Sequence, residues 1–309
     1  MRVTTVVGLV GSLVSTGLLV ALAAIGIPQP AAAAEPILVR NINRGSESSQ
    51  AASFVRLEGE VYFAADDGRR GRVLWRTDGT PGGTIPVSDL HPGADERIVS
   101  DLHLFDGALL FFAADGNHRE RLWRSDGTEA GSSILKEIRQ GPEGDDCFSL
   151  GWGGVDRSCV ATLAEQLLFV GDDGVNGVEL WATDGTAAGT VMVRDIDPDG
   201  SSYPSRLITV GDVVYFRADD GVHGQELWQS DGTEAGTVMV QDLDPGFRGS
   251  FPSWLTEMGG TLYFSAFDGT ADRLWALPPG AETPLRGTGV RPTDPIFPTW
   301  LTALDDTLY

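Results

Sequence analysis

Short apolar runs alternate with glycine-rich turns along most of the chain. Residues 204–243 show the pattern most clearly: apolar runs occupy 206–210 and 213–217, Glu-Leu-Trp occupies 226–228, and apolar and polar residues alternate over 237–242. Such runs, rich in β-branched and aromatic residues and bounded by turn formers, predict four short β-strands. No helical periodicity of useful length follows the N-terminal segment, so we expect an all-β protein.

The same unit recurs along the chain. A Leu-Trp pair occurs five times, and its tryptophans lie 48, 58, 47 and 47 residues apart. An Asp-Gly-Thr turn follows each of the first four, whereas Leu277–Gly280 stands in its place in the fifth unit. The repeated residues that we expect to serve the fold are Trp75, Trp123, Trp181, Trp228, Trp275, Asp78, Asp126, Asp184 and Asp231.

Four short strands in about 47 residues are typical of a β-propeller blade. One blade cannot bury both of its faces, so several must stack to make a core. We therefore expect residues 35–309 to form a β-propeller-like array of four-stranded blades. An open β-solenoid with the same repeat is the alternative architecture.

Both ends of this region fall inside a repeat. Residues 37–42 align with 191–196 of a fourth strand, and 307–309 align with 261–263 of a second strand. Five full units lie between these two partial ones. Because a strand cut midway leaves a blade unfinished, we expect the sequence to be a fragment that is incomplete at its C-terminus.

The first 34 residues have the layout of a secretory signal peptide. Arg2 precedes an apolar run over residues 6–27, Pro28 and Pro30 break it, and residues 32–34 are alanines suited to cleavage. An uncleaved membrane anchor is the alternative, since about 22 apolar residues can span a bilayer. Cleavage would leave a protein that is secreted, periplasmic or on the cell surface, with no membrane contact.

The charge balance limits the partners. The chain has 44 acidic and 22 basic residues, for a net charge of −22. Nucleic-acid binders carry a basic footprint, so no nucleic-acid partner is expected. An unknown protein or polysaccharide at the cell surface fits the predicted compartment.

The two cysteines, Cys147 and Cys159, bracket the extra residues of the longest unit. In an exported protein they predict a disulfide that closes a surface loop and contributes about 3 kcal/mol. The insertion is a candidate contact surface, because binding function concentrates in loops. A neutral insertion explains the same residues.

One acidic loop is a candidate Ca²⁺-binding site. Asp195, Asp197 and Asp199 stand at alternate positions before a glycine, as in the opening of a Ca²⁺-binding EF-hand loop. Position twelve of that pattern is Arg206 instead of Glu, and no flanking helices are expected. A weak Ca²⁺ site and a solvated turn both fit these residues, and no other cofactor is expected.

No catalytic constellation stands out. Double acids precede glycine turns in three units, at Asp66-Asp67, Asp172-Asp173 and Asp219-Asp220. Residues that repeat with the fold more often cap turns than form the asymmetric carboxylate pair that catalysis needs. The four histidines are scattered, and nucleophile elbows, phosphate-binding glycine loops and Cys-x-x-Cys motifs are missing.

The repeat resembles the ELWxxDGT repeat family of exported bacterial proteins. Residues 179–186 and 226–233 carry the motif in full, while Val73, Arg121 and Arg273 replace its Glu in the other units. The resemblance covers about residues 36–309. It implies a propeller-like protein outside the cytoplasm, and it brings no established reaction or catalytic residues.

Three functions remain open on the sequence alone. The first is an exported module for binding, adhesion or surface structure, because blade geometry accounts for every regular feature of the sequence. The second is a carbohydrate-active enzyme on a propeller scaffold, and the third is a Ca²⁺-stabilised extracellular scaffold. A non-enzymatic function is favoured.

Overall fold

The computed structural model describes residues 38–69, 71–87, 99–114, 120–140, 159–286, 303–304 and 307–308. The chain divides into two units, Met1–Leu38 and Val39–Tyr309, and every strand among the described residues belongs to the second. Within the described ranges, no helix has the length and apolar character needed to cross a membrane.

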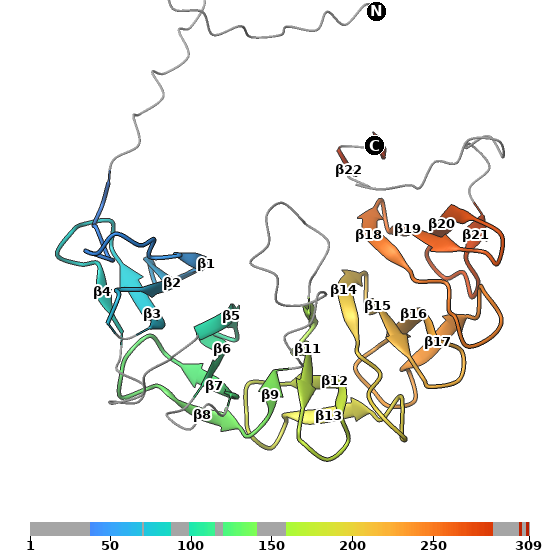
Figure 1. Ribbon diagram of the computed structural model, residues 1–309, viewed down its shortest axis with the longest axis horizontal. Coiled ribbons are helices and arrows are strands. Elements are labelled where there is room, and N and C mark those ends of the chain that lie inside the picture. Colours follow the sequence, from blue (N-terminus) through green and yellow to red (C-terminus); the bar gives the residue numbers. More distant parts are fainter. Residues whose placement is uncertain are drawn as a thin grey trace, which may run out of the picture. The chain divides into compact units, whose positions relative to one another are not determined.

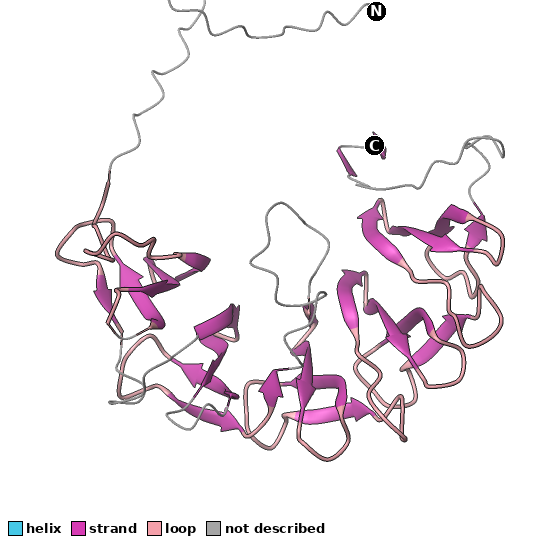
Figure 2. Cartoon of the chain, in the orientation of Figure 1, coloured by secondary structure: helices cyan, strands magenta, loops and turns pink. Residues whose placement is uncertain are grey.

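Antiparallel strands joined by turns build this second unit (Figure 1, Figure 2). In chain order they are β1 (Ala52–Leu57), β2 (Glu60–Asp66), β3 (Arg72–Thr77), β4 (Ile85–Pro86), β5 (Val99–Phe105), β6 (Ala108–Ala114), β7 (Glu120–Ser125), β8 (Ser133–Lys136), β9 (Arg139–Gln140), β10 (Val160–Leu163), β11 (Gln166–Asp172), β12 (Val178–Thr183), β13 (Val191–Arg194), β14 (Ser205–Val210), β15 (Val213–Asp219), β16 (Gln225–Ser230), β17 (Val238–Gln241), β18 (Ser253–Met258), β19 (Thr261–Phe267), β20 (Asp272–Leu277), β21 (Leu285–Arg286), β22 (Ala303–Leu304) and β23 (Thr307–Leu308).

Each sheet is built from one repeat. Its strands pair in chain order, giving blade 1 (β1–β4), blade 2 (β5–β8), blade 3 (β10–β13), blade 4 (β14–β17) and blade 5 (β18–β21). The short strand β9 adds to blade 3 by pairing with β11, and β22 pairs with β23. A β-solenoid would instead pair strands of successive repeats. The predicted all-β array of four-stranded, propeller-like blades is therefore confirmed.

The same aromatic pair marks every blade. The Phe of the second strand lies opposite the Trp of the third strand in all five registers. These pairs are Phe63–Trp75, Phe111–Trp123, Phe169–Trp181, Phe216–Trp228 and Phe264–Trp275. The five tryptophans are only 3–9% exposed, so the repeat places its largest side chains in the core.

The core lies between neighbouring blades. Phe216 and Trp228 of blade 4 share one buried cluster with Leu168 and Leu180 of blade 3. Clusters of the same kind join blade 1 to blade 2, blade 2 to blade 3 and blade 4 to blade 5. Blades 2 to 5 therefore bury their aromatic pairs against the blade that precedes them, as stacking requires.

Basic side chains also reach from one blade to the next. Arg194 of β13 donates to Thr237 O at 2.6 Å and lies 6.0 Å from the Trp228 ring centroid in blade 4. Arg40 makes the same contacts with Thr84 O and Trp75 of blade 1. Lys136 donates to Ala187 O at 3.3 Å. These cations add an electrostatic link to the apolar contact between blades.

The segment that contains Arg40 is not a strand. Its alignment with 191–196 predicts a fourth strand, but the structure assigns none to residues 38–42. A strand needs a neighbour for its backbone hydrogen bonds, and the described residues offer this segment no third strand to pair with. Its side chains nevertheless keep the blade contacts, since Ile42 packs against the cluster of Phe63 and Trp75.

Removing one ring from the inter-blade core should destabilise the protein strongly. We expect Phe216→Ala to lower the free energy of unfolding by about 3–5 kcal/mol, because Phe216 is fully buried and its loss leaves a cavity. Val191→Ala, on a strand position that is 49% exposed, should change it by about 0.5 kcal/mol or less. Denaturant titration measures both, and equal losses would contradict this placement of the core.

Candidate functional site

The Asp-Gly-Thr turns share one hydrogen-bond pattern. In blade 3, Asp184 Oδ1 accepts bonds from Thr186 N at 2.8 Å and Thr186 Oγ1 at 2.7 Å. Thr183 Oγ1 accepts from Gly185 N, and Thr186 Oγ1 accepts from Gly189 N. The turns of the other three blades with this motif repeat the pattern with Asp78, Asp126 and Asp231. Asp, Thr and Gly thus serve the turn itself.

These hydrogen bonds keep the turn carboxylates ionised. The bonds from the Thr hydroxyl and N–H lower the pKa of the turn aspartate in all four blades. No second carboxyl group is involved in these shifts. The environment therefore stabilises a permanent negative charge and does not prepare a proton donor.

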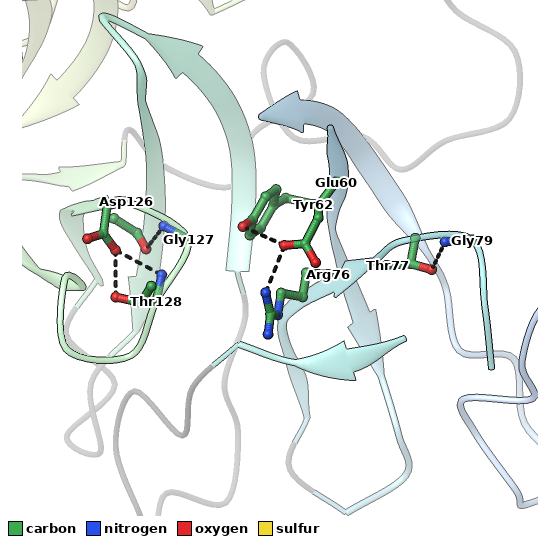
Figure 3. A network of polar contacts seen from close by, with 9 residues as sticks. Glu60, Tyr62, Arg76, Thr77, Gly79, Asp126, Gly127 and Thr128 are labelled. Carbon is green, nitrogen blue, oxygen red and sulfur yellow. Dashed lines mark hydrogen bonds and ion pairs between the residues drawn. The ribbon is translucent and has the colours of Figure 1, made fainter. Parts of the chain in front are cut away.

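Three of the four Asp-Gly-Thr glycines lie against the preceding blade. Gly127 has φ +89°, and a Cβ atom there would collide with the Tyr62 hydroxyl of blade 1. At Gly232 a Cβ would lie 2.5 Å from Gln166 Oε1 of blade 3. Figure 3 shows the turn at Asp126 beside Tyr62, whose hydroxyl donates to Glu60, while Arg76 binds the same carboxylate. Only glycine satisfies both the positive φ and the close approach.

Two buried glutamates tie the third strand of one blade to the linker that leads to the next. Glu226 is fully buried and accepts bonds from Ser250 N at 2.7 Å, Leu243 N at 3.4 Å and the Ser250 hydroxyl. Glu179 makes the equivalent bonds with Ser202 and Ile196 N. This is the Glu of the Glu-Leu-Trp motif, and its function is to hold the inter-blade linker.

Burial raises the pKa of both glutamates. Desolvation raises the pKa of Glu226 to about 7, against the lowering effect of the Ser250 and Leu243 bonds, and the charge of Asp242 raises it further. Glu179 has a raised pKa for the same reason, with Asp195 as its acidic neighbour. Two carboxyl groups in a poorly hydrated place favour retention of a proton.

Blades 1, 2 and 5 have a residue other than glutamate at this position. In blade 2, Arg121 takes its place and forms an ion pair of 3.6 Å with Glu137, which stands where Asp195 does in blade 3. Arg273 of blade 5 donates to Asp268 Oδ2 at 3.2 Å. Val73 of blade 1 is buried. An arginine opposite an acid in blade 2 thus corresponds to two carboxyl groups in blades 3 and 4.

The candidate Ca²⁺ ligands lie on the linker between blades 3 and 4. Asp197 Oδ1 accepts from Asp199 N at 3.3 Å, and Asp197 O accepts from Gly200 N, so this segment is a tight turn. Asp195 Oδ1 is buried without a hydrogen-bond partner. Within the described ranges, no group of three or more His, Cys, Asp or Glu is arranged to hold a metal ion. A Ca²⁺ site at Asp195, Asp197 and Asp199 stays a prediction.

The double-acid loops of blades 3 and 4 are also turns held by their own carboxylates. Asp220 accepts bonds from Val222 N, His223 N and the His223 ring, and Asp173 accepts from Val175 N and Asn176. Partial burial opposes ionisation of Asp220, but these bonds outweigh it and lower its pKa. The bond to Asp220 raises the pKa of His223. These side chains shape the loops in which they stand.

Only one of the two cysteines can be placed. Cys159 is 7% exposed and belongs to the core cluster of blade 3, and it is not a free thiol. Cys147 and the rest of the insertion, residues 141–158, lie outside the described residues. Their pairing and the function of the insertion stay predictions.

Comparisons with known proteins give structural likeness without close sequence similarity. No protein-family model matches this chain, and no curated protein matches it. Among solved structures, it is similar to a puromycin hydrolase S511A mutant complexed with PGG (TM-score 0.48, 17% identity, 79% of this chain and 38% of that one).

Two further structures show a similar level of likeness. One is a Mycobacterium tuberculosis puromycin-hydrolyzing peptidase (TM-score 0.45, 16% identity, 76% of this chain and 37% of that one). The other is prolyl oligopeptidase B from Galerina marginata (TM-score 0.46, 12% identity, 77% of this chain and 37% of that one). This chain thus spans less than two fifths of the length of these proteins. The likeness concerns the arrangement of strands and does not bear on activity.

Loss of a turn carboxylate should weaken a blade locally. We expect Asp231→Ala to lower the free energy of unfolding by about 1 kcal/mol, because Thr233 loses the acceptor of two hydrogen bonds. Asp212→Ala, at an exposed turn of the same blade, is the matched control and should have little effect. Denaturant unfolding of both variants checks this, and equal effects would contradict the capping function.

The buried glutamate predicts a pH-dependent stability. Because the folded-state pKa of Glu226 is about 7 and its unfolded value is near 4.5, the folded state holds an extra proton between these values. The protonated Glu226 side chain contributes fully to the free energy of unfolding below pH 4.5, and this contribution is lost as the pH rises through 7. Relative to Glu226→Gln, the wild-type free energy of unfolding should fall over this window by about 3 kcal/mol.

The measurement is denaturant unfolding at several pH values between 4.5 and 8. Glu234→Gln, at an exposed position of the same blade, should leave the pH profile of the wild type unchanged. Parallel profiles for the wild type and Glu226→Gln would show that the buried carboxyl group does not titrate in this range.

Proposed function

We propose that this chain is an exported module that binds a partner at the cell surface. The observation that carries the proposal is the use of the repeated polar residues. Each Asp-Gly-Thr aspartate, each motif glutamate and the double acids of blades 3 and 4 accept hydrogen bonds from their own turns or linkers. The repeated chemistry therefore serves the scaffold, and binding is left to side chains that differ between blades.

The compartment follows from the sequence predictions. A signal peptide over residues 1–34, a Cys147–Cys159 disulfide and an acidic, repeat-built chain suit a protein outside the cytoplasm. The resemblance to the ELWxxDGT repeat family supports the same compartment. An adhesive or structural surface function suits a scaffold that offers several loops from rigid blades.

The proposal predicts binding without turnover. The full chain would be tested on a glycan array, against cell-wall preparations, and with a panel of polysaccharide and peptide substrates. We expect retention on at least one surface component and no hydrolysis or elimination products. A thermally unfolded sample serves as the control for non-specific adsorption. Turnover of any substrate by the purified protein would instead establish an enzyme on a propeller scaffold.

A further inference from the structure

Adjoining loops form a continuous row across blades 3, 4 and 5. We define this loop row as residues 172–177, 197–203, 219–224, 244–251 and 268–271. Figure 1 shows the sheets from which these loops extend. The row alternates between loops that join second and third strands and linkers that join one blade to the next.

Hydrogen bonds and a β-bridge link each loop of the row to the next, partly through the adjoining strand residues Val178, Gln225 and Phe267. Ser202 N donates to Val178 O at 3.1 Å, and Ser202 O accepts from Asp219 N at 2.9 Å. Gly249 bridges to Gln225, and Phe251 N donates to Gln225 O at 3.0 Å. Phe267 N donates to Ser250 O at 2.8 Å. The loops therefore form one connected surface.

Five large apolar side chains of this row are exposed. Val175 is 84% exposed, Val222 65%, Phe247 86%, Tyr203 51% and Phe251 52%. Single exposed apolar residues need no explanation, but a connected group of them marks an interaction surface. Aromatic residues are also enriched where proteins bind other proteins.

The backbone conformation of the row recurs in blade 1, but its apolar side chains do not. Tyr203 and Phe251 have φ of +46° and +50°, and Gln50 of blade 1 has the same +46°. Val175 and Val222 occupy the loop position that Arg69 holds in blade 1. The fold thus requires these conformations but not these apolar side chains, since blade 1 has polar ones at both places.

Carboxylates flank the exposed apolar groups. Asp173 and Asp220 hold the loops of Val175 and Val222 through hydrogen bonds, and both have lowered pKa values, so they are ionised at neutral pH. Asp197, Asp199 and Asp244 add charge on the linkers. The row's own basic residues are Arg248 and the His223 that pairs with Asp220. From adjoining strands, Arg273 and Arg286 bind Asp268 and Arg139 lies beside Gly174, so acidic residues remain in excess in the described row.

Exposed apolar side chains flanked by carboxylates favour some classes of partner over others. An acidic polysaccharide would be repelled, and so would a second copy of a chain with net charge −22. A neutral glycan would leave the fixed carboxylates without complementary charge. Basic side chains that alternate with apolar ones complement both features of the row.

We propose that the loop row binds a basic polypeptide segment with apolar side chains, and that Val175, Val222 and Phe247 are its main contacts. The proposal rests on the binding function proposed above and names its surface and partner class. The carboxylates attract and orient the segment, and the exposed valines and phenylalanine bury its apolar side chains.

The test uses fluorescence anisotropy with the full chain and synthetic peptides. The probe is a labelled peptide of lysine and leucine, and the comparison peptides replace leucine by serine or lysine by glutamate. We expect the Lys/Leu peptide to bind, the other two to bind at least tenfold more weakly, and added salt to weaken binding. Equal binding of the Lys/Ser peptide would reduce the interaction to general charge attraction and overturn the proposal.

Two multiple variants locate the surface. Val175→Ser/Val222→Ser/Phe247→Ser should weaken Lys/Leu peptide binding at least tenfold, whereas Val191→Ser/Val238→Ser, exposed on outer edge strands, should leave it unchanged. Unfolding curves confirm that both variants fold, which is expected because all five side chains are solvent-exposed. No peptide binding, or equal binding by both variants, would overturn the loop-row proposal.

One outcome separates this proposal from the broader binding function. If a neutral polysaccharide is bound and the loop-row variant loses it, the partner class is wrong while the binding function stands. Substrate turnover would contradict the binding function itself, whatever the peptide result.

Discussion

The architecture depends on one packing requirement: each four-stranded sheet has an apolar face that it cannot cover alone. The Phe–Trp pairs of blades 2 to 5 meet this requirement by packing on the blade before them, as Phe216 and Trp228 do on Leu168 and Leu180, and the pair of blade 1 packs with Ile42. Burying these rings removes a large apolar area from water and so favours the stacked state. The recurrence of tryptophan every 47 or so residues is the sequence consequence of this contact.

The polar residues of the motif also support the packing between neighbouring blades. The Asp-Gly-Thr turn brings a glycine close against the preceding blade, while Glu226 fixes the linker to the following blade through Ser250. Arg194 and Lys136 then bind turn carbonyls of the next blade. A buried glutamate without a basic partner is costly, so this link depends on protonation, whereas blade 2 uses the Arg121–Glu137 ion pair.

The fold was predictable from the sequence because its signals are local and repeated. Strand runs, Asp-Gly turns and tryptophan spacing each lie within one unit, and five copies make their register unmistakable. The function of Glu179 was not predictable, because its partner Ser202 lies 23 residues away on a linker. The contacts that Arg40 makes with blade 1 and Lys136 with blade 3 were not predictable for the same reason. Strand β9 arises within the long unit, where no sister copy offers an alignment.

The same logic explains why the candidate site was harder to find than the fold. A repeat search favours residues that recur, and in this protein recurrence identifies structural residues such as Asp184 and Trp181. Binding residues of a repeat protein are those that vary on a constant backbone, as Gln50, Tyr203 and Phe251 do at one positive-φ position. In a single sequence such variable positions carry no recognisable pattern. Only the structure shows that these loops adjoin one another and expose their apolar side chains, which is why we propose the loop row as the binding surface.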